Sequence, residues 1–425
     1  MLEISFIKEN KERILEGLKV RNFPEKDWNI VDKVLDLDEK RKVVQTELDN
    51  ILAERNALSK SIGDFFKQGK KEEADQLKLK VNALKEGVSQ LEDDLKATKE
   101  ALAETLVILP NIPHPSVPPG HSDQDNEVAK AWKDPLPELG EDALPHWELA
   151  TKYGIFDLEL GVKITGSGFP VFRAKGAKLV RSLISFFLDE ANKAGYEEVI
   201  PPLLVNEDTA YATGQLPDKE GQMYYAPKDN LYLIPTAEVP VTNIFRDVII
   251  KEDDFPIRLT AYTPCFRREA GSYGAHVRGL NRVHQFDKVE IVRIEHPERS
   301  YQALDEMVAH VEGLLQKLEL PYRILRLCGG DLGFTSALTY DFEVYSAAQK
   351  RWLEVSSVSN FETFQSNRLK LRYKSENGNQ LTHTLNGSAL ALARIIAAIL
   401  ENNQSPKGIV IPKVLQSYTG FDLID

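Results

Sequence analysis

Apolar residues spaced alternately four and three positions apart dominate the beginning of this 425-residue chain. The first run consists of Ile30, Val34, Leu37, Val44, Leu48, Ile51, Leu58 and Ile62, with Arg41 and Arg55 in the two skipped positions. The second run consists of Leu77, Val81, Leu84, Val88, Leu91, Leu95, Thr98 and Leu102. This heptad spacing is typical of long helices that pack along a seam. Because the pattern is interrupted at 63–69, we expect an antiparallel helical hairpin over about residues 28–105.

The far half of this predicted hairpin is basic, although the whole chain carries a net charge of −12. Between residues 55 and 85 eight basic residues outnumber four acids; the basic ones are Arg55, Lys60, Lys67, Lys70, Lys71, Lys78, Lys80 and Lys85. A phosphate backbone would bind such a surface. A solvated coiled-coil face would carry the same charges, so the pattern alone leaves both interpretations open.

Three regions of different composition follow one another along the chain. Residues 1–109 read as almost continuous helix. Residues 110–146 contain eight prolines, which is typical of a semi-rigid linker. Residues 147–425 mix short alternating strands with helices, as expected of an α+β or mixed α/β domain.

Several classes of protein are excluded by composition. The two cysteines, Cys265 and Cys328, are too few for a disulfide framework or a cysteine-rich zinc site, and they suit a reducing compartment. The sequence contains no apolar run of the roughly 18 residues that a membrane helix needs. Residues 1–10 lack the basic and apolar segments of a signal peptide. We therefore expect a soluble cytoplasmic protein without a membrane association.

A predicted β-hairpin around residues 266–290 combines arginines, acids and an aromatic ring. If its flanks are strands, one surface displays Arg267, Glu269, Arg282, Phe286 and Glu290. Guanidinium groups and a ring form a suitable cradle for the phosphates and the base of a nucleoside triphosphate. A solvent-exposed amphipathic hairpin is the alternative. The loop 270–281 is long and glycine-containing, which indicates a mobile functional element.

The segment from Gly387 to Leu400 is apolar at nearly every position, which predicts a buried helix. Its one charge, Arg394, requires an anionic partner in such surroundings. The partner is either an internal carboxylate or a phosphate of a bound ligand.

These segments resemble the signature motifs of class II aminoacyl-tRNA synthetases. The Arg267 hairpin looks like motif 2, residues 387–394 look like motif 3, and Gly195–Pro202 is similar to motif 1, whose proline ends a strand at a dimer interface. The helical hairpin, the triplet 236–238, the segment 354–360 and the triplet 386–388 extend the resemblance. Together they make the chain similar to the seryl-tRNA synthetases of the bacterial type over essentially its whole length.

The resemblance implies an α+β fold in three parts. Residues 1–109 form a tRNA-binding arm, an antiparallel coiled-coil hairpin, and residues 110–146 form the linker. Residues 147–425 form a class II catalytic domain with a central, mostly antiparallel β-sheet flanked by helices. The implied activity is that of a serine–tRNA ligase, which activates L-serine with ATP and Mg²⁺ and loads tRNA(Ser), and also tRNA(Sec) where the cell has one. The resemblance further implies a homodimer and serine recognition without zinc.

Site residues are carried over position by position. The implied serine-binding residues are Thr236, Ala237, Glu238, Glu290, Asn386 and Ser388. The implied ATP-binding residues are Arg267, Arg268, Glu269, Arg282, Val283, Phe286, Glu354, Val355, Ser356, Ser357 and Arg394, of which Arg267 and Arg394 are the catalytic residues. Glu354 and Ser357 are the implied Mg²⁺ ligands. Because residues three apart point to opposite faces of a regular strand, this pair requires a bulge or a strand end near Ser356.

Two alternative functions are compatible with parts of this pattern. A synthetase-like ligase could adenylate a small amino acid and load a carrier protein, but such relatives lack the long arm. A catalytically decayed, RNA-binding scaffold should have lost Arg267, Glu290 or Arg394, and all three are present.

Overall fold

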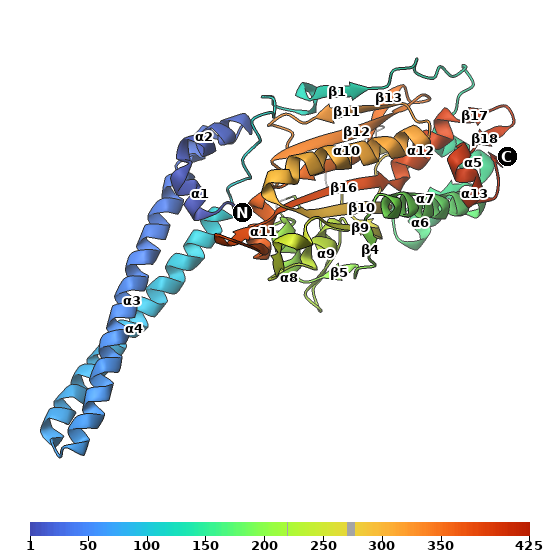
Figure 1. The fold of residues 1–425 in the computed structure, drawn as a ribbon. Helices are drawn as coiled ribbons and strands as arrows, with labels where there is room; N and C mark the ends of the chain where they lie inside the picture. The colour runs from blue at the N-terminus through green and yellow to red at the C-terminus, as the bar shows by residue number, and fades with distance from the viewer. Residues whose placement is uncertain (219, 270–276) are drawn as a thin grey trace. The chain divides into compact units, whose positions relative to one another are not determined.

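The computed structural model of the protein describes residues 1–218, 220–269 and 277–425 (Figure 1). Most of the predicted loop 270–281, namely 270–276, therefore lies outside the described residues. The chain divides into two units. The first comprises Met1–Lys19 and Phe23–Pro110, and the second comprises Val20–Asn22 and Asn111–Asp425.

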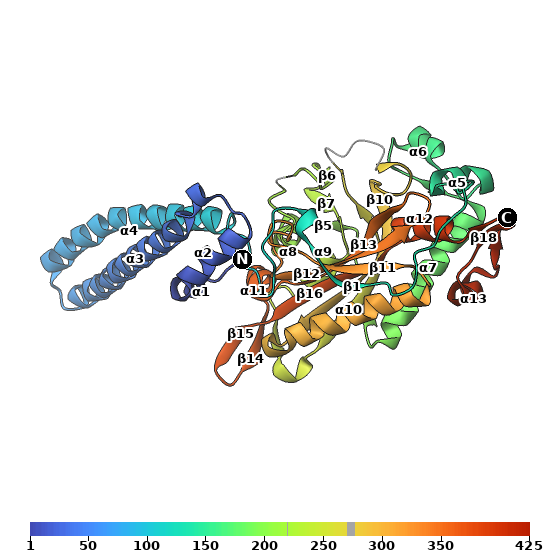
Figure 2. The ribbon, with the colours of Figure 1, turned by 90° about the horizontal axis from the view of Figure 1, so that it is seen from above.

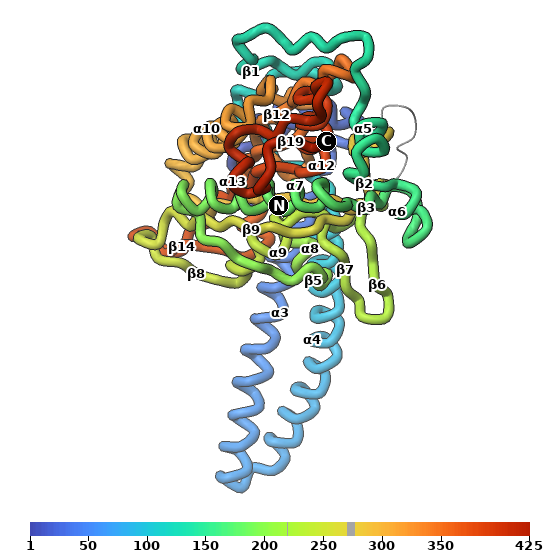
Figure 3. The backbone as a smooth tube through the Cα atoms, turned by 90° about the vertical axis from the view of Figure 1, so that its right-hand side faces the viewer, coloured from blue at the N-terminus to red at the C-terminus, as the bar shows by residue number. Residues whose placement is uncertain are grey.

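The first unit is helical, and its two long helices form the predicted antiparallel hairpin. The helical segments are α1 (Ile4–Glu9), α2 (Lys11–Val20, whose last residue belongs to the second unit), η1 (Glu25–Asp27), α3 (Ile30–Lys67) and α4 (Lys71–Leu106). Helices α3 and α4 lie side by side (Figures 1 and 3). The predicted seam holds them together, since Val44, Leu48, Val88 and Leu95 form one buried cluster.

The turn of the hairpin is shorter than the sequence indicated. Helix α3 continues through Gly63 to Lys67, so the chain reverses over residues 68–70. The prediction of a break over 63–69 was wrong because this stretch makes contacts of its own across the hairpin. The Lys78 ammonium lies over the Phe66 ring, 4.5 Å from its centroid. Gly69, with φ of 76°, supplies the left-handed residue of the turn.

Eight strands form the main sheet of the second unit, in the order β1-β11-β12-β13-β16-β10-β9-β4. Their bounds are β1 Glu127–Ala131, β4 Glu197–Glu198, β9 Ile257–Phe266, β10 Gln285–Glu295, β11 Tyr322–Arg326, β12 Leu338–Ser346, β13 Arg351–Asn360 and β16 His383–Ala391. Neighbours are antiparallel except for the parallel pair β4 and β9. This confirms the predicted mostly antiparallel sheet.

Alternation along the strands gives the sheet a face that packs on the main core and an opposite face that is polar near the carboxyl end of β9. In β10, Val289 and Ile291 belong to the main hydrophobic core, whereas Lys288 and Glu290 point to the opposite side. The long helices that contribute to that core are α7 (Ala174–Lys193), α10 (Ser300–Lys317) and α12 (Leu392–Asn402) (Figures 1 and 2). Because these helices cover one face, the part of the opposite face around Lys288 and Glu290 is left to form a site.

Shorter elements complete the second unit. The small sheets contain β2 (Phe156–Asp157) with β3 (Val171–Phe172); β5 (Leu204–Val205), β7 (Leu231–Leu233) and β6 (Tyr225–Ala226); β15 (Gly378–Leu381), β14 (Arg372–Ser375) and β8 (Ile249–Lys251); and β17 (Gln404–Ser405), β18 (Gly408–Val410) and β19 (Leu423–Ile424). The remaining helices are α5 (His146–Tyr153), α6 (Leu158–Ile164), α8 (Glu207–Thr213), α9 (Glu238–Asn243), α11 (Thr363–Leu369) and α13 (Gln416–Thr419).

The proline-rich stretch 110–146 contains a strand that the sequence did not predict. Strand β1 pairs with β11 at the edge of the main sheet. All five of its residues are exposed, so it lacks the apolar alternation by which a strand is recognised in a sequence. Residues 111–146 belong to the second unit.

Across the described residues, no helix combines the length and the apolar character that crossing a membrane requires.

Candidate active site

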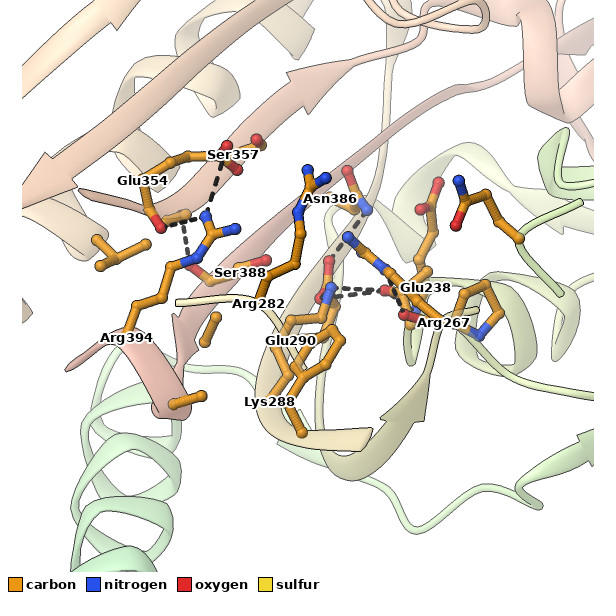
Figure 4. Close-up of a pocket in the computed structure, with 18 of the residues that line it drawn as sticks. Glu238, Arg267, Arg282, Lys288, Glu290, Glu354, Ser357, Asn386, Ser388 and Arg394 are labelled. Atoms are coloured by element: carbon orange, nitrogen blue, oxygen red, sulfur yellow. Dashed lines mark hydrogen bonds and ion pairs between the residues drawn. The ribbon is translucent and has the colours of Figure 1, made fainter. Parts of the chain in front are cut away.

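The polar face of the main sheet carries a pocket with a cavity volume of about 510 Å³ (Figure 4). Its floor comes from β10, β13 and β16, and its sides come from the segments around residues 235, 267 and 282. Most of the predicted site residues line it: Thr236, Glu238, Arg267, Glu269, Arg282, Val283, Phe286, Glu290, Glu354, Val355, Ser356, Ser357, Asn386, Ser388 and Arg394. Segments from widely separated parts of the sequence are thus brought together.

The hairpin of β9 and β10 forms as predicted, but its strands are shorter. Strand β9 ends at Phe266 and β10 begins at Gln285, so Arg267, Glu269 and Arg282 lie beyond the ladder. The expectation that strand alternation places them on one face was therefore wrong. Glu269 even adopts a left-handed φ of 48°, which no strand allows.

These three side chains nevertheless face the pocket, because local contacts replace the ladder. The Arg267 amide donates to the His284 carbonyl over 2.9 Å, which continues the pairing by one bond. The Arg282 guanidinium forms an ion pair of 3.2 Å with Glu269. The Arg267 guanidinium lies 5.3 Å from the centroid of the Phe286 ring. A cation and an aromatic face are thus held beside each other at one end of the pocket.

The segment 387–400 differs from its prediction at its beginning. Residues 387–391 belong to strand β16 and helix α12 begins at Leu392, so the prediction of a helix from Gly387 was wrong. The reason is tertiary, since the segment pairs with both β10 and β13, and Ser388 lies opposite Glu290. The expected burial of the helix itself is confirmed.

Arg394 lies in the first turn of α12, and its side chain is about one-quarter exposed at 26%. Its guanidinium donates to the carbonyls of Asn281 over 2.9 Å and of Glu354 over 2.6 Å. The Glu354 carboxylate is 3.6 Å away (Figure 4). An internal carboxylate therefore pairs with Arg394, and the arginine also lines the pocket. The two interpretations of this charge do not exclude each other.

One end of the pocket is built around the Glu290 carboxylate, which is almost fully buried. One of its oxygens accepts from Asn386 over 3.0 Å, and the other lies 2.5 Å from the Lys288 ammonium (Figure 4). Lys288 also donates to the Thr236 hydroxyl over 2.8 Å. Two to three hydrogen bonds fix the carboxylate, so it can accept from a small ligand without rearranging.

Glu238 is a second buried carboxyl group at the same end. Burial, with the nearby charge of Glu290, raises the pKa of Glu238 from its ordinary value of 4.5 to about 7. Gln365 donates to it over 2.7 Å and is itself held by the Thr384 hydroxyl over 2.7 Å. A buried carboxyl whose pKa is raised in this way beside a second carboxylate is typical of a functional site.

The bulge that Glu354 and Ser357 required is present in β13. Phe342 pairs with Ser356 and Glu343 pairs with Glu354, so one partner residue is skipped at Val355. This confirms the expected bulge, and both Glu354 and Ser357 line the pocket.

Two predicted residues do not reach the pocket within the described part of the chain. Ala237 is fully buried at the beginning of α9. The Arg268 guanidinium lies over the Tyr224 ring, 5.6 Å from its centroid. Conversely, Lys288 lines the pocket and Gln365 supports Glu238, and neither was predicted from the sequence. The available signal for Lys288 was its spacing of two residues from both Phe286 and Glu290, which places all three on one face of a strand.

The pocket thus has an acidic end, at Glu238 and Glu290, and an arginine-rich end, at Arg282 and Arg394; Arg267 lies near Glu238 and faces both ends (Figure 4). Such an arrangement suits a ligand that carries an ammonium group together with a partner that carries phosphates.

Two family models match the chain. They are the seryl-tRNA synthetase N-terminal domain, over residues 1–113, and the tRNA synthetase class II core domain (G, H, P, S and T), over residues 224–403. A serine–tRNA ligase of Salinibacter ruber is 50% identical over 424 residues, which cover 99% of this chain and 98% of that protein.

Solved structures give the same result. The seryl-tRNA synthetase from Pyrococcus horikoshii, complexed with ATP, is 34% identical with a TM-score of 0.90, and the match covers 100% of this chain and 99% of that chain. The cytoplasmic serine–tRNA ligase from Naegleria fowleri, in complex with AMP, is 26% identical with a TM-score of 0.86 and the same coverage.

A mostly antiparallel sheet with this pocket on its polar face is the catalytic core of a class II aminoacyl-tRNA ligase. Since the relatives match over the full length, arm included, the chain belongs to the seryl-tRNA synthetase family, the serine–tRNA ligases. Neither a carrier-protein ligase nor a decayed scaffold is favoured by these matches.

Proposed function

We propose that the pocket binds L-serine at its acidic end and ATP at its arginine-rich end, and that it joins the two as seryl-adenylate. The observation that carries this proposal is the separation of charge along one continuous pocket. Glu290, Thr236 and Glu238 would hold the ammonium and hydroxyl groups of serine. Ser388 and Asn386 would close the small end of the pocket.

Activation requires the serine carboxylate to attack the α-phosphorus of ATP. A new bond forms between the carboxylate oxygen and phosphorus, and the bond to the pyrophosphate oxygen breaks, so pyrophosphate leaves. Negative charge builds up on the α-phosphate oxygens, and Arg267 and Arg394 would neutralise it. Catalysis then rests on positioning and electrostatics, without a covalent enzyme intermediate. Phe286 would stack on the adenine, and Glu269 would accept from its amino group.

Glu354 and Ser357 fit a magnesium ion, since both present oxygen atoms and the bulge turns both toward the pocket. When bound there with the ATP phosphates, Mg²⁺ would supply positive charge that stabilises the phosphates. Serine would be recognised by these side chains without a zinc ion.

The size and polarity of the acidic end would select serine. Threonine would add a methyl group to a pocket end that is closed by Ser388 and Asn386. Alanine and glycine would leave the buried Glu290 carboxylate without the hydroxyl donor, which costs much of the binding energy.

In the second step, the terminal ribose hydroxyl of tRNA(Ser) would attack the carbonyl carbon of seryl-adenylate, and AMP would leave. Residues 55–85, the basic tip of the hairpin of α3 and α4, would bind the RNA backbone by shape and charge. Because this mode reads no single anticodon, tRNA(Sec) would also be accepted.

We further infer a homodimer in the cytoplasm. The segment after β4 exposes apolar side chains, with Ile200 at 91% and Leu204 at 45%. Apolar side chains exposed next to an edge strand are typical of an interface. Sedimentation of the protein and of an Ile200→Asp variant checks the dimer, which the variant should weaken. The two free cysteines suit a reducing cytoplasm.

The test is ATP–pyrophosphate exchange without tRNA, across all twenty amino acids. We expect exchange with serine alone. We expect Arg267→Ala to reduce it by about 10²- to 10³-fold, because a donor to the developing charge is lost. Arg181→Ala, an exposed arginine of α7, is the matched control. Exchange with glycine or alanine instead would favour the carrier-protein ligase, and no exchange at all would favour the decayed scaffold.

A further inference from the structure

Two titratable residues with no part in the reaction above are completely buried next to the pocket. His146 opens helix α5, Glu401 lies near the end of α12, and the side chains of both are 0% exposed. His146 Nδ1 lies 2.6 Å from Glu401 Oε1. A buried carboxylate and a buried imidazole are costly to desolvate, so their presence calls for a reason.

Glu401 is saturated with hydrogen-bond donors. Its Oε1 accepts from the His146 amide over 2.9 Å and from Gln349 over 2.8 Å, and its Oε2 accepts from the Ser346 hydroxyl. Burial alone would raise the pKa of Glu401, but the hydrogen bonds from His146 and Ser346 lower it below its ordinary value. The carboxylate is therefore an anionic acceptor that orients the imidazole.

The second ring nitrogen of His146 is bound to the end of the loop that precedes Arg282. The Leu280 amide lies 2.8 Å from His146 Nε2. Since an amide N–H can only donate, Nε2 must be the acceptor and the ring proton must lie on Nδ1, where it is donated to Glu401. The carboxylate thereby selects the tautomer that holds the Leu280 backbone.

The absence of a side chain at Gly279 makes room for this contact. Gly279 has φ of 71°, and a Cβ built on it would lie 2.2 Å from His146 Nε2. A side chain here would displace the imidazole or the backbone, so glycine allows the ring to approach the chain.

The residue after Leu280 connects this contact to the catalytic arginine. The Asn281 carbonyl accepts from Arg394 Nε over 2.9 Å, and the Asn281 side-chain amide donates to Gln349 over 2.9 Å. The Leu280 amide is held by His146 and the Asn281 side chain is held by Gln349, and both His146 and Gln349 bind Glu401.

We propose that His146, oriented by Glu401, is a positioning residue for ATP activation: it fixes the 279–281 backbone, whose Asn281 carbonyl aims the Arg394 guanidinium into the pocket. This inference rests on the proposed role of Arg394 at the α-phosphate. His146 touches neither serine nor ATP, and its effect passes through Arg394. Arg394 would contact the α-phosphate already in bound ATP, so a displaced guanidinium should weaken ATP binding; misplacement by about 1 Å can cost about 10²-fold.

Two substitutions of His146 distinguish a role in holding the Leu280 backbone from a role in packing alone. In His146→Asn, the amide can replace Nδ1 as donor to Glu401, but nothing reaches the Leu280 amide. In His146→Gln, the longer side chain can place an oxygen near the position of Nε2 and accept from Leu280. In serine-dependent exchange, we expect His146→Asn to raise the ATP KM about 10- to 100-fold. The serine KM should stay unchanged, and His146→Gln should recover most of the ATP KM.

Equal ATP KM values for the two variants, or equal increases in the ATP and serine KM values, would overturn the proposal. Melting temperatures are measured in parallel, because a role confined to packing would lower them without separating the two substrates.

A second pair keeps the test decisive if the histidine variants do not fold. Gly279→Ala should raise the ATP KM as His146→Asn does. Gly420→Ala is its matched control, since Gly420 has nearly the same φ of 72° with nothing within 4 Å of an added Cβ. An unchanged ATP KM in Gly279→Ala would contradict the proposal.

Failure of the proposed function looks different from failure of this inference. In the first case, the unaltered chain shows no serine-dependent exchange, or Arg394→Ala leaves the ATP KM unchanged. In the second, both behave as expected and His146→Asn resembles the unaltered chain.

Discussion

At the scale of the single residue, Glu238 should favour serine binding and lower the stability of the folded protein. Its pKa is raised to about 7 in the folded protein, whereas the unfolded carboxyl titrates near 4.5. Between these values the folded state keeps a proton that the unfolded state has lost, so stability falls as the pH rises from about 4.5 to 7. Glu238→Gln carries no such proton and can still accept from Gln365. At pH 8 without serine, we expect the free energy of unfolding of this variant to be about 2–3 kcal/mol larger than that of the parent protein.

Thermal or denaturant unfolding at pH 4 and pH 8 checks this expectation. The gain should be small at pH 4, where both states of the parent protein keep the proton. A gain of equal size at both pH values would show that titration of Glu238 is not its cause.

The same residue predicts the pH dependence of serine binding. An ionised Glu238 attracts the ammonium group and a protonated one does not, so the serine KM should rise as the pH falls through about 7. Glu238→Gln should remove this inflection and raise the serine KM at pH 8 by about tenfold or more. Exchange assays between pH 6 and 8.5 measure both. A parent serine KM that is flat across this range would exclude Glu238 from ammonium binding.

At the scale of the element, strand β16 depends on the absence of a side chain at Gly387. The strand lies between β10 and β13, and a Cβ at this residue would lie 3.0 Å from Val358 and 3.5 Å from Ile291. Gly387→Ala should cost about 1–3 kcal/mol through overpacking. It should also raise the serine KM, because Asn386 and Ser388 flank the displaced residue.

A double-mutant cycle tests the cause. Val358→Ala removes the methyl groups that the new Cβ would meet, so the double variant should be more stable than the sum of the two single effects. Gly313→Ala in α10, where an added Cβ meets nothing within 4 Å, is the control. Additive effects would place the strain elsewhere.

The elements differ in how much of them the sequence could predict. The helices α3 and α4 were predictable because sixteen heptad positions repeat one signal. Residues 387–391 were not, since apolar and small residues suit a buried helix and a central strand equally, and pairing with β10 and β13 decides between them. Strand β1 was missed because its residues are all exposed.

Residues that belong to spaced motifs could be predicted to lie together, whereas supporting residues from other elements could not. Arg267, Glu290 and Arg394 belong to spaced motifs and line one pocket as expected. Gln365 comes from helix α11, and no spacing relates it to Glu238, which is 127 positions away. Long-range pairing of this kind leaves no local pattern.

At the scale of the whole molecule, the arm and the pocket should be separable in function. Removing 55–67 and 71–84, while keeping the turn 68–70, deletes the basic tip and preserves the buried cluster at the base of the hairpin. Serine-dependent exchange should stay unchanged, since every residue of the pocket lies in the second unit. Aminoacylation of tRNA(Ser) should fall by about 10²-fold, because phosphate contacts are lost.

Measuring both reactions on the same preparation checks the separation. Charging that survives the truncation would refute the assignment of the arm to tRNA, whereas loss of exchange would show that the tip supports the pocket.

The segment Val20–Asn22 limits how such a protein can be divided. The chain enters the second unit at Val20, leaves it after Asn22 and returns at Asn111. There the Arg21 guanidinium donates to the carbonyls of Asn111, Leu332, Gly333 and Ser336. A fragment that began at the proline-rich boundary would lack this four-carbonyl anchor, and of the four carbonyls Gly333 would keep its bond from the Ser336 amide. The second unit therefore cannot be transferred without Val20–Asn22. Gene fusion, domain exchange or circular permutation has to include this short segment.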